Sequence, residues 1–411
     1  MAKRKRQPLH TTAPAQERAV LVAADTPQAD HWSVEASLDE LAMLARTAGA
    51  RPVARVSQKL RHPDPNSYIG KGKLQEIVES RPDLQYSVAI FDDELSPAQQ
   101  RNLEKKLDVK VIDRTALILD IFAQRARTRE GKLQVALAQH EYLVPRLRGQ
   151  WSHLERMEGA IGLRGPGETQ LETDRRLIRN QIKKLKQEIE QVRGHRKGYR
   201  QQRQKAGVPI VALVGYTNAG KSTLMNRLTH ADVKARNRLF ETLDPVTRRC
   251  HLTDDLTVLL TDTVGFIQKL PTHLIAAFRA TLEELSDADL LLHVVDVTHP
   301  DAAEQAQTVE DTLDALEIGD RPRLTVFNKA DQFEIEGIGH PRDLDDLAVA
   351  TEELQVARPD AVLISAAKDW GIDTLRSRVT RALAEGVEVA TPAPEPMPVV
   401  AAEPPAQTWV S

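Results

Sequence analysis

The chain has 411 residues, of which 41% are hydrophobic, and its formal net charge is −3 at pH 7. This length suggests two or three domains, and the apolar content is ample for packed cores. The single cysteine, Cys250, cannot form an internal disulfide, so the chain suits a reducing cytoplasm. No apolar run approaches the roughly 18 residues of a membrane-spanning helix, and the basic start lacks the apolar segment of a secretion signal. These features argue against a membrane-spanning or secreted, disulfide-rich protein.

Charge is distributed unevenly along the chain. Between residues 123 and 205 there are 20 Lys and Arg against 9 Asp and Glu, a net charge of +11, which leaves −14 for all other residues. Such segregation indicates a segment that faces a polyanion. Residues 1–15 form a basic arm that is predicted to be disordered, and contact of this arm with nucleic acid is the alternative.

Residues 16–126 alternate between strand-like and helix-like segments. Strands are expected at residues 19–23, 52–56, 87–91 and 109–112, and helices at 38–45, at 73–78, after Ser96 and from Thr115. Ser96-Pro97 is a pair that opens helices, because a capping side chain is followed by a first-turn proline. The alternation predicts a small α/β domain whose parallel sheet is covered by helices.

A glycine- and lysine-rich loop, residues 68–73, precedes the second of these helices. It lacks the full spacing of a phosphate-binding loop and a Ser or Thr after its lysine. We therefore interpret it as a structural turn or a contact for the RNA backbone. A second nucleotide site is the alternative.

Residues 127–206 carry apolar residues at helical spacing in two stretches, 132–143 and 171–192. Between them, residues 159–168 contain too much glycine to be helical. Short apolar seams with charged outer faces predict an antiparallel helical hairpin with a glycine-rich tip. We expect the tip to contact nucleic acid, and a helical linker with solvated charge is the alternative.

The strand-like residues 210–214 run into a glycine loop and then into the helix-like residues 223–228. The loop fits G-x-x-x-x-G-K-[ST], in which backbone N–H groups and the positive end of the next helix hold a phosphate chain. In such loops Lys221 reaches the β- and γ-phosphates, and the Ser222 hydroxyl ligates Mg²⁺. The predicted phosphate-binding residues are Gly215, Tyr216, Thr217, Asn218, Ala219, Gly220, Lys221, Ser222 and Thr223.

A second strand, residues 257–261, ends in a short motif that belongs beside the glycine loop. The motif is Asp262-Thr263-Val264-Gly265. Its carboxylate can hold Mg²⁺ through water, and the Gly265 N–H can meet the γ-phosphate.

The strand at residues 324–327 ends in residues that select the base. The Asp331 carboxylate of Asn328-Lys329-Ala330-Asp331 can accept both the N1–H and a 2-amino hydrogen of guanine. Adenine presents an acceptor at N1, so the base is predicted to be guanine. A further strand, residues 361–364, leads to Ser365 and Ala366, whose backbone can contact the guanine oxygen. Elements at the carboxyl ends of successive strands predict a doubly wound sheet that binds GTP at that edge.

Hydrolysis requires that the charge of the γ-phosphate is neutralised and that a water molecule is placed in line with it. The first task is assigned to Lys221, the loop backbone and Mg²⁺ on Ser222 and Thr242, with Thr247 as the alternative to Thr242. Thr242 lies in the segment Phe240-Glu241-Thr242, a predicted switch loop. After Gly265, where many GTPases have a water-orienting glutamine, this chain has Phe266. We therefore expect slow GTP hydrolysis by the protein alone, and a partner that completes the catalytic site.

Asn218 suggests a second cation. An asparagine at this loop position resembles that of potassium-activated GTPases, where its oxygen helps to hold K⁺ against the phosphates. An asparagine that shapes the loop by its own backbone hydrogen bonds is an equal alternative.

Three stretches together, residues 114–126, 161–176 and 215–222, resemble the signatures of the HflX family of ribosome-associated GTPases. The similarity covers roughly residues 16–386. It implies a cytoplasmic, monomeric GTPase, with peripheral membrane association as an open possibility. Such an enzyme binds the large ribosomal subunit and splits stalled or idle ribosomes, notably under heat stress. The tip of the hairpin would lie near the peptidyl-transferase centre, and the implied RNA contacts are Arg164, Gly165, Pro166 and Gly167.

The resemblance also implies a domain order. A ribosome-binding α/β domain at 16–126 would precede the hairpin at 127–206 and the doubly wound GTPase domain at 207–386. In some members the N-terminal domain also binds ATP. Many members carry a further C-terminal domain, whereas residues 387–411 here are rich in Pro and Ala and are expected to be disordered. The alternative function is an RNA-binding assembly or anti-association factor that uses GTP mainly as a structural switch.

Overall fold

The computed structural model describes residues 16–27, 32–149, 166–205, 207–229, 239–271, 274, 285–332, 339–341, 343, 346 and 361–385. The chain forms two compact units, one built on residues 33–117 with the preceding first strand and one on residues 118 onward. The basic arm and the Pro/Ala-rich tail predicted at the two ends lie outside the described residues. Among the described helices, none is long and apolar enough to cross a membrane.

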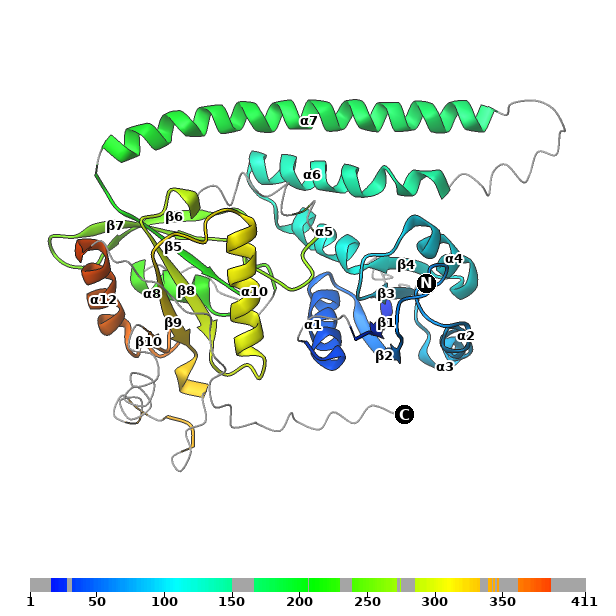
Figure 1. Ribbon diagram of the computed structural model, residues 1–411, viewed down its shortest axis with the longest axis horizontal. Helices are drawn as coiled ribbons and strands as arrows, with labels where there is room; N and C mark the ends of the chain where they lie inside the picture. Colours follow the sequence, from blue (N-terminus) through cyan, green and yellow to red (C-terminus); the bar gives the residue numbers. More distant parts are fainter. Residues whose placement is uncertain are drawn as a thin grey trace, which may run out of the picture. The chain divides into compact units, whose positions relative to one another are not determined.

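The first unit contains a four-stranded, wholly parallel sheet, as predicted, and its strand order is β2-β1-β3-β4. The strands are β1 (Arg18–Asp25), β2 (Arg51–Lys59), β3 (Val88–Phe91) and β4 (Lys110–Asp113). Helices α1 (Val34–Thr47), α2 (Lys71–Glu79), α3 (Arg81–Leu84) and α4 (Pro97–Leu107) connect them (Figure 1). Strands β1 and β3 are buried almost throughout, since both lie in the middle of the sheet.

Local sequence signals explain where these helices begin. Ser96 forms a capping box with Gln99 before α4, and Pro97 occupies the first turn, as the Ser-Pro pair predicts. Helix α5 (Arg114–Arg125) begins where the Asp113 carboxylate accepts the backbone N–H groups of Ala116, at 2.8 Å, and of Leu95, at 3.0 Å. Asp113 thereby ties the end of β4 to the start of α5.

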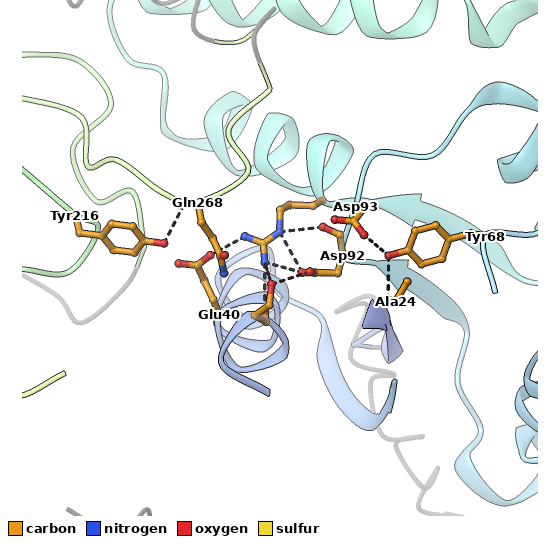
Figure 2. Close-up of polar contacts among 9 residues, drawn as sticks. Ala24, Glu40, Tyr68, Asp92, Asp93, Tyr216 and Gln268 are labelled. Carbon is orange, nitrogen blue, oxygen red and sulfur yellow. Dashed lines mark hydrogen bonds and ion pairs between the residues drawn. The ribbon is translucent and has the colours of Figure 1, made fainter. Parts of the chain in front are cut away.

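A charge cluster is buried in this unit. Arg114 donates to Asp92 and to Glu40, both at 2.6 Å, and its side chain is only 1% exposed. Burial disfavours the charged guanidinium, but the two carboxylates outweigh burial and raise the pKa of Arg114. Figure 2 shows Glu40 and Asp92 in this cluster, and Tyr68 between Asp93 and the backbone of Ala24. The first residue of the stretch 114–126 therefore has a structural role.

Two long helices follow, and they pack against each other as a hairpin. They are α6 (Arg129–Leu143) and α7 (Pro166–Lys205), with a 3-10 turn, η1 (Arg146–Gly149), after α6. His140 Nε2 lies 2.9 Å from Gln181 Oε1, and Lys186 forms an ion pair with Glu141 at 2.8 Å. The predicted antiparallel hairpin is thus observed (Figure 1).

The predicted tip requires one correction. Residues 166–168 were expected to lie in the non-helical tip, but α7 begins at Pro166. A proline fits the first turn of a helix, because its missing N–H has no partner there anyway. The rest of the predicted tip, residues 159–165, lies outside the described residues.

The second unit also contains a six-stranded sheet in the order β10-β9-β8-β5-β7-β6. The strands are β5 (Ile210–Gly215), β6 (Val246–His251), β7 (Thr257–Asp262), β8 (Leu290–Asp296), β9 (Arg323–Asn328) and β10 (Val362–Leu363). All neighbours are parallel except β6, which pairs antiparallel with β7 at the edge. Helices α8 (Lys221–Thr229), α10 (Ala302–Ala315) and α12 (Ile372–Glu385), with the short η4 (Ala330–Gln332), complete this doubly wound fold.

Candidate nucleotide-binding site

A cavity of about 280 Å³ opens beside the loop between β5 and α8. It is lined by residues from the glycine loop, from the segment before β6, from the segment after β7 and from the segment after β9. These residues are Thr217, Asn218, Gly220, Lys221, Ser222, Thr223, Phe240, Glu241, Thr242, Thr263, Gly265, Lys329 and Gln332. Apart from Gln332, every one of them is a site residue predicted from the sequence.

The glycine loop curls around the side chain of Lys221. The ammonium group donates to the carbonyl oxygens of Gly215, at 2.9 Å, and of Tyr216, at 2.7 Å. Burial lowers the pKa of Lys221 to about 8, although the nearby Asp262 carboxylate acts in the opposite direction. A buried cation inside a loop of backbone N–H groups is a site for a polyphosphate.

Gly220 is a glycine for two physical reasons. Its φ is +96°, which L side chains rarely adopt, and an added Cβ would lie 2.2 Å from Asn328 Nδ2. Asn328 uses that amide to donate to the Ala219 carbonyl at 2.8 Å. The end of β9 is therefore fastened to the glycine loop, which links the predicted base-selecting motif to the predicted phosphate-binding one.

Three oxygen-bearing side chains meet at the start of α8. Ser222 Oγ and Thr242 Oγ1 both donate to Asp262 Oδ2, at 2.7 and 2.8 Å, and the two hydroxyl oxygens are 3.0 Å apart. Burial raises the pKa of Asp262, against the opposing effects of Lys221 and the two hydroxyls. Asp262 Oδ1 is buried and has no hydrogen-bond partner within the described part of the chain.

This oxygen cluster fits Mg²⁺, a cation that prefers hydroxyl, carboxylate and water ligands. The unpaired Oδ1 of Asp262 supplies an acceptor for a metal-bound water. Thr247, the alternative to Thr242, lies elsewhere: it belongs to the edge strand β6, and its hydroxyl is 3.0 Å from that of Thr261. The structure brings Thr242, and not Thr247, to Ser222.

The residues predicted to select the base also converge. Ser365 Oγ donates to Asp331 Oδ1 at 2.6 Å, and the Ala366 N–H donates to Asn328 Oδ1 at 3.0 Å. These partners are 34 and 38 positions apart in the sequence, and the parallel pairing of β9 with β10 brings them together. Asn328, Asp331, Ser365 and Ala366 thus form one group at the carboxyl end of the sheet.

Two residues of this region were not predicted. Asp296, which ends β8, accepts from Lys329 Nζ at 2.5 Å and fixes that side chain at the cavity wall. Gln332 lines the cavity at the end of η4. The signal for Asp296 was present, because a carboxylate directly after residues 290–295, a run that is apolar except for His293, marks another strand end.

The segment after β7 is joined to the glycine loop by backbone hydrogen bonds. The Phe266 N–H donates to the Gly215 carbonyl at 3.1 Å, and the Thr217 N–H donates to the Phe266 carbonyl at 2.8 Å. The ring of Phe266 is 1% exposed and carries no group that can orient water. Nearby, the Gln268 N–H donates to the Tyr216 hydroxyl at 2.9 Å, as Figure 2 shows.

Some predicted site residues do not line the cavity. Tyr216, Ala219, Asp262, Val264 and Asn328 are buried behind it, where they shape the loop and the sheet edge. Phe240 lines the cavity, but its ring packs edge-on against Phe122, with ring centroids 4.7 Å apart. Of the predicted RNA contacts, Arg164 and Gly165 lie outside the described residues, and Pro166 and Gly167 open α7.

Three family models match successive parts of this chain. Residues 35–123 match the family described as GTP-binding GTPase N-terminal, residues 125–203 the GTP-binding GTPase Middle Region, and residues 210–329 the 50S ribosome-binding GTPase. The chain is 47% identical over 346 residues to the GTPase HflX of Escherichia coli, across 84% of this chain and 79% of that protein. The chain belongs to the HflX family.

A second GTPase HflX relative agrees with this assignment. The HflX protein of Caldanaerobacter subterraneus is 47% identical over 375 residues, which covers 91% of this chain and 82% of that protein. A crystal structure of a GTP-binding protein from Sulfolobus solfataricus with GDP is similar over 90% of this chain and 99% of that one, at 25% identity and a TM-score of 0.45. As a member of a family of ribosome-binding GTPases, this protein binds GTP and hydrolyses it.

Proposed function

We propose that this HflX-family GTPase binds the large ribosomal subunit through its helical hairpin and splits stalled or idle ribosomes, notably under heat or other stress. Hydrolysis of GTP is stimulated by the ribosome and times the release of the enzyme. A cytoplasmic location and a monomeric state are part of this proposal. So is the division into an N-terminal domain at 16–126, the hairpin at 127–206 and a GTPase domain at 207–386.

The observation that carries the proposal is the exposed basic face of α7. Along this helix Ile178, Ile182 and Leu185 are partly buried and Ile189 is buried, whereas five cationic side chains are exposed. These are Arg176, Arg179, Lys183, Lys184 and Lys186. A rigid hairpin that buries its apolar seam and presents cations on its outer face fits the phosphate backbone of RNA. We assign the RNA contacts to Arg164 and Gly165 of the predicted tip and to Pro166 and Gly167 at the start of α7.

For the chemistry, we assign the phosphates to the backbone of the glycine loop and to Lys221. Ser222, Thr242 and Asp262 would hold Mg²⁺, which neutralises charge on the phosphates when it is bound. Asp331 accepts hydrogen bonds from the guanine edge, and Ser365 keeps its carboxylate in place. We assign the Gly265 N–H to the γ-phosphate, because Gly265 lies close to Lys221: an added Cβ at Gly265 would lie 3.1 Å from Lys221 Nζ.

Hydrolysis also requires an ordered attacking water. Phe266 has no polar group that could order this water. In other GTPases a partner that completes the site supplies on the order of 10³–10⁵ in rate. We therefore assign this step to the ribosome-bound state of the enzyme. An assembly factor that uses GTP only as a structural switch would show no such stimulation.

A role for K⁺ is a further part of the proposal. Asn218 lines the cavity with an exposed side chain, which leaves its oxygen available to a cation held against the phosphates. The competing explanation is conformational: Asn218 has φ of +64°, and asparagine tolerates this left-handed region better than most residues.

We do not assign ATP to the loop before α2. The Gly70 N–H, at the start of that helix, donates to Gln58 Oε1 at 2.7 Å, so an N-terminal amide that would bind phosphate already has a partner. Asp64 accepts backbone N–H groups of Asn66 and Ser67, both at 2.8 Å, and closes the preceding turn. We interpret residues 64–70 as a structural turn.

The test is the steady-state GTP turnover with and without purified large ribosomal subunits, over a range of salt concentrations. We expect a marked stimulation that weakens as salt rises, because phosphate contacts by Lys and Arg release counterions. Substituting Arg176, Arg179 and Lys183 together by Gln should weaken subunit binding and its salt dependence but leave nucleotide affinity unchanged. Turnover that large subunits do not alter would overturn the proposal.

A further inference from the structure

The segment between α8 and β6 carries two side chains that point to different parts of the second unit. Thr242 joins the oxygen cluster with Ser222 and Asp262, at 3.0 and 2.8 Å. Two residues later, Asp244 contacts the start of α6, the first helix of the hairpin. This short segment therefore connects the candidate metal site to the base of the hairpin.

Asp244 caps the amino-terminal end of α6. Its Oδ2 accepts the backbone N–H groups of Arg127, at 2.7 Å, and of Thr128, at 2.9 Å, and its Oδ1 accepts the Thr128 hydroxyl. Thr128 is itself the N-cap residue, because its Oγ1 accepts the Gly131 N–H at 3.0 Å. A carboxylate at this end is also favoured by the helix dipole. The helix thus begins with one cap from its own N-cap residue, Thr128, and a second from Asp244, a residue 116 positions away from Thr128.

Gly131 leaves room for this carboxylate. A Cβ added at Gly131 would lie 2.2 Å from Asp244 Oδ1, inside any tolerable contact distance. Gly131 lies in the first turn of α6 without a positive φ, so its backbone does not require glycine. In a helix, glycine is less favourable than alanine by roughly 1 kcal/mol. The space needed by Asp244 therefore explains a glycine that the helix itself does not favour.

A second contact fixes the same segment. The ring of Phe240 packs edge-on against Phe122 in the second half of α5, at an interplanar angle of 83°, and both rings are buried. Residues 240 and 244 are thus attached to the helices at the base of the hairpin. Thr242 lies between these two attached residues and contacts Ser222 and Asp262.

We propose that Asp244 is a positioning residue that couples Thr242, and with it the nucleotide state, to the orientation of α6. In GTPases the segment that carries this threonine is ordered by the γ-phosphate and its Mg²⁺, and is released on hydrolysis. When Thr242 is ordered, Asp244 is placed at the amino-terminal end of α6. A movement of α6 in turn displaces Thr242, because Asp244 is hydrogen-bonded to the start of that helix. Linkage makes the two effects reciprocal in free energy. The ribosomal part of this inference, stimulation through the hairpin, rests on the proposed function.

The test measures amide hydrogen exchange of residues 127–131 in the full-length protein, without ribosomes, by mass spectrometry. The protein is loaded with GDP or with a non-hydrolysable GTP analogue. The N–H groups of Arg127 and Thr128 donate directly to Asp244, so they report the contact. We expect exchange to be roughly 2- to 10-fold slower with the GTP analogue than with GDP, the effect of about one hydrogen bond.

Two variants and one control decide the outcome. Asp244→Ala should abolish the difference between the two nucleotides, and Asp244→Asn should restore part of it, because an amide oxygen still accepts. Gly131→Ala, which favours the helix but displaces the carboxylate, should also abolish it. Gly194→Ala is the matched control, because that glycine lies in α7 with nothing within 4 Å of an added Cβ, and the difference should persist. Equal exchange in both nucleotide states of the parent, or a difference that persists in Asp244→Ala, would overturn the coupling.

A second measurement separates this inference from the proposed function. If the exchange difference depends on Asp244 but large subunits do not stimulate turnover, the coupling stands and the ribosomal role fails. If subunits stimulate the parent and Asp244→Ala to the same extent, the ribosome acts by another route and the coupling is not used. We expect Asp244→Ala and Gly131→Ala to lose most of the stimulation, and Gly194→Ala to retain it.

Discussion

Ser365 holds the carboxylate of Asp331: its hydroxyl donates to Asp331 Oδ1 at 2.6 Å and fixes one oxygen of the proposed guanine-selecting side chain. The Ser365 hydroxyl also accepts the Lys368 N–H at 3.1 Å, so its own orientation is set. Asp331 belongs to the segment after β9, but the orientation of its carboxylate is fixed by Ser365, which follows β10. The proposed base selection is therefore a joint property of two strand ends.

Asp331→Asn should weaken GTP binding and create affinity for xanthosine triphosphate. The new amide can donate to the 2-oxo group of xanthine but meets guanine donor-to-donor, and an unpaired buried polar group costs about 1–3 kcal/mol. We expect roughly a 5- to 150-fold loss of GTP affinity in a fluorescent-nucleotide titration. Unchanged GTP affinity would contradict the guanine assignment.

Thr242→Ala should lower GTP turnover and raise the Mg²⁺ concentration needed for half-maximal rate, since one of the two hydroxyl groups that contact Asp262 is removed. Thr247→Ala is the matched control, because that hydroxyl faces Thr261 within the sheet edge. Turnover titrated with Mg²⁺ distinguishes the two variants. If Thr247→Ala had the larger effect, Thr247 in β6 and not Thr242 would be assigned as the metal ligand.

Replacing K⁺ by Na⁺ at equal ionic strength should slow GTP hydrolysis if Asn218 helps to hold a potassium ion. Asn218→Ala should then remove the difference between the two salts. Asn218→Gly is informative beside it, because glycine accepts the observed φ of +64° without strain. Equal turnover of the parent in both salts would leave Asn218 with a conformational role only.

Arg114→Ala should destabilise the N-terminal unit by about 3–5 kcal/mol, since it leaves two carboxylates buried without their cation. The measurement is hydrogen exchange of β1 peptides in a urea series, which reports this unit separately from the GTPase domain. Lys105→Ala, on the exposed face of α4, should change the stability by less than about 0.5 kcal/mol. If Arg114→Ala left the stability of the N-terminal unit unchanged, the buried cluster would be able to relax around the two carboxylates.

Much of this architecture follows from local sequence signals. The glycine loop, the capped helix after Ser96 and the apolar strands are encoded within a few residues each, so they are predicted with their order. Strand β8 was missed although it is buried throughout, because His293 interrupts its apolar run. Edge strand β6 was missed because polar residues occupy most of its positions.

Relationships between distant residues were not predictable in the same way. A basic residue at the start of a helix reads as a surface side chain, and only the fold shows Arg114 enclosed by Asp92 and Glu40. Asp244 likewise reads as an ordinary turn residue before Pro245. Its contact with the start of α6 joins segments separated by more than 100 residues, and no local pattern encodes it.

The central claim, that GTP binding drives the hairpin to separate ribosomal subunits, is tested most directly by light scattering of intact ribosomes. The protein is added with GTP, with a non-hydrolysable analogue or with GDP. The account predicts a fall in scattering with GTP and with the analogue, little change with GDP, and repeated rounds of splitting only with GTP. A variant in which residues 162–167 are replaced by a short Gly/Ser linker should bind GTP normally and leave the scattering unchanged. Scattering that stays constant with the parent protein and GTP, or that falls equally with the linker variant, would contradict the account.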